Sequence, residues 1–72
     1  MQTSWETELM SFVASLSDCA FVMTLHAGWM ARVDGLVVMG GKYGTLVMTQ
    51  YGGLIQKRSA YGNGVWTDWT DV

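Results

Sequence analysis

The stretch that decides the fold closes the chain: Tyr51-Gly52-Gly53-Leu54-Ile55-Gln56-Lys57-Arg58, then Gly62-Asn63-Gly64-Val65-Trp66-Thr67-Asp68-Trp69. It opens with a glycine pair, and glycine readily takes the positive φ that tight turns demand. A segment of strand length follows and contains a basic pair. A second turn, rich in glycine and asparagine, leads to two tryptophans. This order predicts a β-strand between two turns, and therefore an antiparallel sheet.

Further strands are predicted upstream of this stretch. From Cys19 to His26 apolar residues recur with a period of two, which is typical of a strand buried on at least one side. Asp34-Gly35 lies between two apolar segments and predicts a hairpin turn. Gly40-Gly41 predicts the next turn, which leads into a strand over Tyr43–Tyr51. Residues 19–72 are therefore expected to form an antiparallel β-meander.

Residues 3–17 are predicted to form an amphipathic helix that ends at Ser17-Asp18. Thr3 and Glu6 have the spacing of a capping box, in which each side chain bonds a free backbone N–H of the first turn. Apolar residues then follow on one helical stripe: Trp5, Leu9, Phe12, Val13 and Leu16. With the meander, the helix makes one α+β domain over residues 1–72.

Self-association is expected from the size and composition of the chain. A chain of 72 residues buries a limited fraction of its surface and usually needs a disulfide, a metal or a partner chain. Cys19 is the only cysteine, so no internal disulfide can form, and a single histidine excludes a typical zinc site. Half of the residues are apolar, including six Met and four Trp. The remaining means of stabilisation is contact between copies of the chain.

The charge pattern argues against several classes of partner. A net charge of −2 with only four Lys and Arg disfavours nucleic acid, which is bound mainly through basic side chains. No apolar run approaches the ~20 residues of a membrane-spanning helix. Glu6 and Glu8 stand where a signal peptide would be basic. We therefore expect no nucleic acid, no membrane insertion, and synthesis in the cytoplasm.

No arrangement of residues in the sequence indicates catalysis. His26 is the single imidazole, and Cys19 lies seven residues earlier in the same predicted strand, hence on the opposite face and about 23 Å away. Asp68 and Asp71 could form a glycosidase pair, but they lie in a terminal segment that has no room for a cleft. We predict a protein without enzymatic activity, cofactor or metal.

The exposed aromatic residues are the candidate ligand-binding residues. Trp29, Tyr43, Tyr51 and Tyr61 lie at predicted turns or strand ends, where their rings could stack on sugar rings. Gln50 could form hydrogen bonds with the sugar hydroxyls, since an amide both donates and accepts hydrogen bonds. Packing at a subunit interface is the alternative for each aromatic residue.

The closing stretch also resembles a known family. From Gly44 to Val72 the chain resembles the small β-rich modules of bacteriophage tail fibres and R-type pyocin fibres, called pyocin-knob modules. The resemblance is carried by Arg58, the turn Gly62-Asn63-Gly64, and the pair Trp66 and Trp69. It implies a homotrimer in which the tryptophans are structural and Arg58 holds the last segment through a carboxylate such as that of Asp68, or through a carbonyl. Because Trp66 and Trp69 are three apart, similar roles for both require a bulge or turn at residues 67–68.

The resemblance implies a function as well. We expect a tail-fibre or tailspike module of a virion, homotrimeric and without enzymatic activity, that contributes to binding of bacterial surface polysaccharide or joins a longer fibre. Two alternatives stay open. One is a fibre assembly or trimerisation accessory protein, and the other is a small phage-encoded inhibitor of a host protein.

Overall fold

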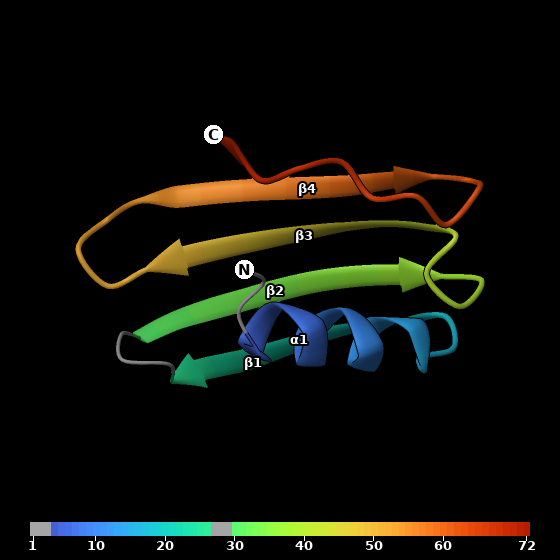
Figure 1. Cartoon of the computed structure of the whole chain (residues 1–72), viewed down its shortest axis with the longest axis horizontal. Helices are drawn as coiled ribbons and strands as arrows, with labels where there is room; N and C mark the ends of the chain where they lie inside the picture. Colours follow the sequence, from blue (N-terminus) through green and yellow to red (C-terminus); the bar gives the residue numbers. More distant parts are fainter. Residues whose placement is uncertain (1–3, 27–29) are drawn as a thin grey trace.

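The computed structural model describes residues 4–26 and 30–72, which form one helix and one five-stranded sheet. Helix α1 is followed by strands that lie in the sheet in chain order, each antiparallel to the next (Figure 1). The predicted α+β fold with a β-meander is confirmed. The elements are α1 (Ser4–Ala14), β1 (Cys19–His26), β2 (Met30–Val38), β3 (Tyr43–Gln50), β4 (Ile55–Tyr61) and β5 (Thr70–Asp71).

Helix α1 packs through the predicted apolar stripe but ends earlier than predicted. Leu9 and Val13 are fully buried against the sheet. The helix ends at Ala14 rather than near Ser17, because the N–H groups of Ser15 and Leu16 bond carbonyls only three residues back, which tightens the last turn. The predicted N-terminal cap, Thr3, lies outside the described residues.

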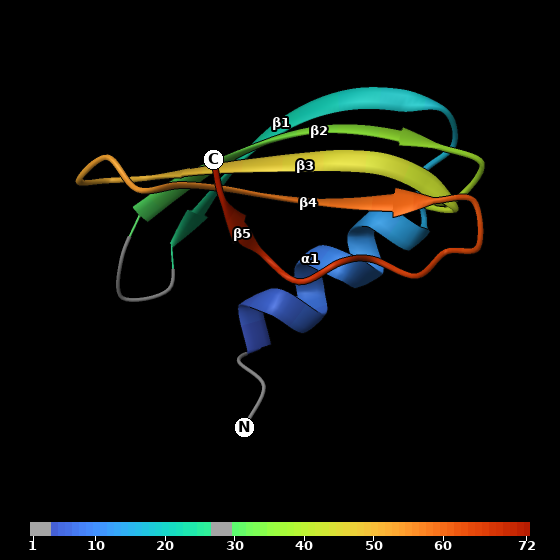
Figure 2. The ribbon, with the colours of Figure 1, turned by 90° about the horizontal axis from the view of Figure 1, so that it is seen from above.

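One face of the sheet carries the core. Figure 2 shows α1 and the C-terminal segment on the same side of the sheet, with the other face open. The side chains between α1 and the sheet come from the helix and from the two central strands; they are Leu9, Val13, Ala31, Val33, Val37, Leu46 and Met48. Residues of β1 on this face are half-buried, as the predicted alternation of that strand requires.

The predicted hairpin turn at Asp34-Gly35 is wrong. Both residues lie inside β2, which pairs without interruption with β1 on one side and β3 on the other. Glycine is needed there for space rather than for a turn. A Cβ atom on Gly35 would lie 2.3 Å from Cε1 of Phe21 and 2.9 Å from Cδ2 of Leu46. The ring of Phe21 therefore fills the place that a side chain would take.

The actual turn between β2 and β3 spans residues 39–42. Met39, Gly40 and Gly41 all have positive φ, and Met39 is the one described non-glycine residue that does. Asp18 stabilises this turn, because its Oδ1 accepts a hydrogen bond from the N–H of Met39 at 2.8 Å. The predicted turns at Gly52-Gly53 and at residues 62–64 are present, with positive φ at Gly52, Gly53, Gly62 and Gly64.

The two long edges of the sheet differ. The C-terminal segment covers β4 along its length, from the bridge between Ala60 and Trp66 to the bond from the N–H of Val72 to the carbonyl of Ile55. On the opposite side, no described strand pairs with the outer edge of β1. The chain thus closes one edge with its own terminus and leaves the other edge of the described sheet unpaired.

Candidate functional site

The candidate site is the sheet face that α1 does not cover, which we call the open face. Strand alternation directs every second side chain of β1 to β4 to this face. Val22 and Leu36 are 64% and 54% exposed there. On the open face, residues that are cross-strand partners lie side by side and form rows that run across the strands. Its rows are Val38–Tyr43–Tyr61, Ala20–Leu36–Thr45–Ser59, Val22–Asp34–Val47–Lys57 and Thr24–Arg32–Thr49–Ile55.

The candidate tyrosines fall into two groups at opposite ends of the open face. Tyr43 and Tyr61 are direct cross-strand partners, and both are exposed. Tyr51 lies beyond the other end of β3, roughly 26 Å from Tyr43 at the rise of an extended strand. The structure thus brings Tyr43 and Tyr61 together and separates Tyr51 from them.

The remaining two candidates do not join either group. Gln50 pairs with Ala31, whose side chain belongs to the buried core, so Gln50 lies on the helix side of the sheet, away from the open face. Trp29 lies outside the described residues.

Tyr51 stands beside a hollow in the open face. The N–H of Tyr51 bonds the carbonyl of Met30 at 3.0 Å, and its side chain is 89% exposed. The hollow measures about 190 Å³. Side chains or backbone from β1, β2 and the turn after β3 line it; these residues are Thr24, Met30, Ala31, Arg32 and Tyr51.

Arg32 and Asp34 form the ion pair of the open face. Oδ1 of Asp34 accepts hydrogen bonds from Nε of Arg32 at 3.2 Å and from Nη2 at 2.8 Å. The two residues are two apart in β2 and therefore share a face. The hydrogen bond and then the charge of Asp34 raise the pKa of Arg32 above its usual value.

Three residues of the closing stretch, Arg58, Trp66 and Trp69, lie on the helix side of the sheet. Nε of Arg58 donates to the carbonyl oxygen of Thr67 at 2.9 Å rather than to Asp68, and the guanidinium lies 5.3 Å from the ring centroid of Trp69. Residues 67–69 leave the regular strand geometry, so Trp66 and Trp69 both pack against the core.

Trp66 and Trp69 differ in their surroundings. The ring of Trp66 lies so close to Gly44 that a Cβ there would be 2.8 Å from it. Nε1 of Trp69 is buried and has no hydrogen-bond partner in the described part of the chain.

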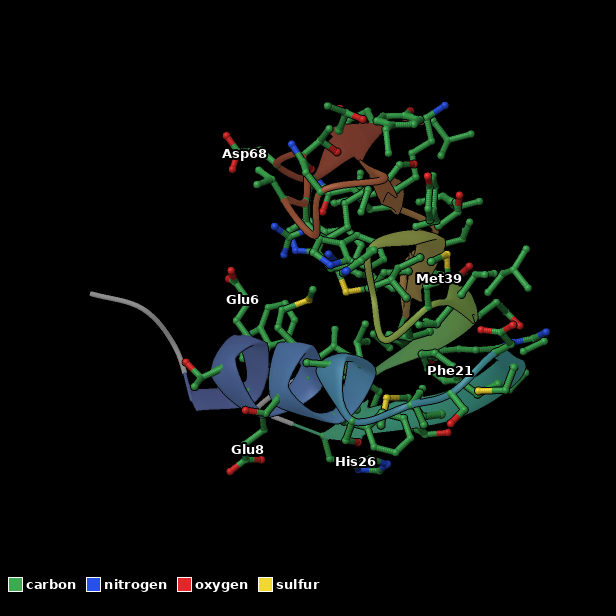
Figure 3. The ribbon with its side chains drawn as sticks, turned by 90° about the vertical axis from the view of Figure 1, so that its right-hand side faces the viewer. Glu6, Glu8, Phe21, His26, Met39 and Asp68 are labelled. Carbon is green, nitrogen blue, oxygen red and sulfur yellow. The ribbon has the colours of Figure 1, made fainter. Side chains whose placement is uncertain are left out.

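The residues considered for catalysis are dispersed. Cys19 and His26 stand at opposite ends of β1 and on opposite faces. Asp68 and Asp71 are exposed, and Asp71 accepts a hydrogen bond from Gln56 at 3.2 Å. Figure 3 shows Asp68 projecting from the C-terminal segment, with Glu6 and Glu8 on α1. Within residues 4–26 and 30–72, no three His, Cys, Asp or Glu side chains group closely enough to hold a metal ion.

Sequence reasoning missed Thr24, Met30, Arg32 and Asp34 as members of the site. The spacing of Arg32 and Asp34 could have indicated a pair on one face of a strand. The prediction of a turn at Asp34-Gly35 excluded that reading, because it placed Asp34 outside a strand. Thr24 and Tyr51 are distant in sequence and meet only through the strand register.

Comparisons with known proteins found no matching family model, no matching curated protein and no matching solved structure. The described helix, α1, is too short and insufficiently apolar to cross a membrane.

Proposed function

We propose that the chain is a module of a phage tail fibre or tailspike, without enzymatic activity, that assembles as a homotrimer and contributes to binding of bacterial surface polysaccharide. The observation that carries this proposal is the open face, where apolar and tyrosine side chains are exposed beside a smaller polar region. The resemblance of Gly44–Val72 to fibre modules supports the trimer and the location in a virion.

One half of the open face suits contact between copies of the chain. We call it the apolar half, after its apolar and tyrosine side chains, which are Val22, Leu36, Val38, Tyr43, Val47 and Tyr61. Its rows also carry Asp34, Thr45, Ser59 and Lys57. Exposed apolar surface of this kind marks an interaction site when its members are contiguous, as the register makes them here. Burying the part of Leu36 and Val22 that is still exposed, 54% and 64% of each, contributes about 1–2 kcal/mol per residue. Tyr43 and Tyr61 are then interface residues rather than sugar-binding residues.

The other half of the open face remains available for a ligand. It carries Thr24, Arg32, Thr49 and the Tyr51 ring, which together offer hydroxyl groups, one cation and an aromatic surface. A trimer presents three such surfaces, and repeated weak contacts to one polymer chain give useful avidity. The fibre then needs no deep pocket in any single copy.

The test uses the substitution Leu36→Glu, which places a charge in the centre of the apolar half. Because the side chain is already more than half exposed in one copy, the fold should survive. We expect light scattering to show dissociated chains, and adhesion to purified lipopolysaccharide or host cells to fall with the lost avidity. Val65→Glu is the matched control, because Val65 is 67% exposed on the C-terminal segment, away from the open face.

Two results would contradict the proposal. A Leu36→Glu chain with the same mass as the unmodified protein would exclude the apolar half as the interface. An unmodified chain that adheres to no polysaccharide of the host surface would exclude the binding function.

A fibre assembly accessory is the second candidate, and the outer edge of β1 favours it. That edge has eight residues, no proline and no bulge in its pairing with β2, so it lacks the usual devices that prevent strand addition. A strand from a larger fibre protein could extend the sheet there. Protection of β1 amides from hydrogen exchange only in the presence of the fibre would support this candidate.

A further inference from the structure

The hollow beside Tyr51 measures about 190 Å³, and the surface that lines it is almost wholly apolar. This volume is smaller than the roughly 300–1,000 Å³ of sites for drug-sized ligands, so it suits a single ring rather than an oligomer. It lies at the end of the sheet where β1 and β3 finish and β2 begins, on the left in Figure 1, on the face away from α1.

The neutral part of the hollow suits a sugar ring. The Tyr51 ring is almost fully exposed beside the apolar side chain of Met30, which gives a surface for the C–H face of a pyranose. The hydroxyls of Thr24 and Tyr51 have no hydrogen bond to another described residue. Each can donate and accept, as sugar hydroxyls require.

Arg32 lines the hollow through its apolar stem, and the guanidinium at the end of that stem adds a preference for an anion. A guanidinium is planar and carries five N–H donors in a fixed arrangement. Asp34 uses one edge of the Arg32 guanidinium, formed by Nε and Nη2, and does so with a single oxygen. The second edge, formed by Nη1 and the other N–H of Nη2, has no hydrogen bond to a described residue and can donate two parallel hydrogen bonds to a carboxylate. Asp34 thus orients the guanidinium without saturating it.

We propose that this hollow binds one acidic sugar residue of a surface polysaccharide. The sugar carboxylate bonds the free edge of Arg32, its ring stacks on Tyr51, and a hydroxyl bonds Thr24. This inference rests on the proposed polysaccharide-binding function and adds the ligand class and the residue that selects it.

The experiment is a titration of the full-length, isotope-labelled chain followed by NMR. The probes are glucuronate and N-acetylneuraminate, each compared with its own methyl ester, which keeps the ring and removes the negative charge. We expect at least one free acid to shift the amide signals of Thr24, Arg32 and Tyr51 in a saturable manner. Its methyl ester should bind about tenfold more weakly, the loss of one charge-assisted pair.

Variants assign the charge preference to Arg32. Arg32→Gln should bind the acid and the ester equally. The double variant Arg32→Gln, Asp34→Asn keeps the net charge of the protein and should also lose the preference. Lys57→Gln is the matched control, because it removes one positive charge from the same face outside the hollow, and it should keep the preference.

Several outcomes would overturn the inference. These are equal affinity for acid and ester in the unmodified protein, an Arg32→Gln variant that still prefers the acid, shifts located elsewhere, or the same shifts produced by sodium sulfate at matched ionic strength. If the chain adheres to polysaccharide in any of these cases, the ligand assignment fails and the proposed function stands. If no polysaccharide adheres at all, the proposed function itself fails.

Discussion

Gly35→Ala is the substitution that most sharply tests the continuous β2 strand. The added Cβ would lie 2.3 Å from Cε1 and 2.4 Å from Cζ of Phe21, distances that a real side chain cannot keep. The Phe21 ring must therefore move. It is held edge-on against Phe12 with the ring centroids 5.4 Å apart.

The expected cost follows from these contacts. An aromatic pair is worth about 0.5–1.5 kcal/mol beyond its buried area, and overpacking a well-packed site costs about 1–3 kcal/mol. We expect Gly35→Ala to lower the free energy of unfolding by about 2 kcal/mol. The loss is a large share of the total free energy of unfolding, because typical domains have only roughly 0.05–0.15 kcal/mol per residue and this chain has 72 residues.

The assay is denaturant unfolding of a double-mutant cycle. Phe21→Leu removes the ring atoms that meet the new Cβ, so Gly35→Ala should cost at least about 1 kcal/mol less in that background, as expected for residues in contact. Gly53→Ala is the control, because Gly53 has φ of 100° and no neighbouring atom at its Cβ position, so its cost is strain that Phe21→Leu cannot relieve. An equal cost of Gly35→Ala with and without Phe21→Leu would refute the reasoning and return a turn at Asp34-Gly35 to consideration.

Four further substitutions test the closing stretch and the turn before β3. Trp66→Ala and Trp69→Ala should each destabilise the fold by about 3 kcal/mol. This is the low end for truncating a buried tryptophan, because both side chains are only half-buried. An unchanged melting temperature of the double variant would show that both are surface residues. Arg58→Met should lower the free energy of unfolding by about 1–2 kcal/mol, because it loses the hydrogen bond to Thr67 and the contact with Trp69. Lys57→Met, the control, should change it little. Equal effects of the two substitutions in thermal unfolding would contradict the role of Arg58 in holding the last segment. Met39→Gly should raise the free energy of unfolding by roughly 0.5–1 kcal/mol. The substitution removes the strain of a positive φ at Met39, and this gain exceeds the loss of backbone entropy that glycine brings. A loss of stability in denaturant unfolding would contradict the turn described.

The sequence predicted the parts of the fold that depend on local patterns. The alternation from Cys19 to His26 identified β1 and its two faces, and the glycine pairs identified the turns on either side of β3. The prediction failed at Asp34-Gly35 because a glycine that leaves room for a ring has the same local signature as a glycine that makes a turn. The ring in question belongs to Phe21, on another strand, and its position follows only from the β1–β2 register.

The candidate site was predictable only in part for the same reason. The exposure of Tyr51 follows from its place beside Gly52-Gly53 and was expected. Its neighbours were not, because Thr24 and Arg32 reach the hollow through pairings between strands that are distant in the sequence. The separation of Tyr43 from Tyr51 by the length of β3 is likewise a property of the sheet rather than of the residues around each ring.

The mass of the assembled protein in solution tests the central claim most directly. That claim is that the open face is closed in part by contact between three copies of the chain. Light scattering of the unmodified chain at micromolar concentration should give three times the 8.0 kDa of one copy. A stable, folded species of 8.0 kDa would contradict the trimer and, with it, the proposed role of the apolar half.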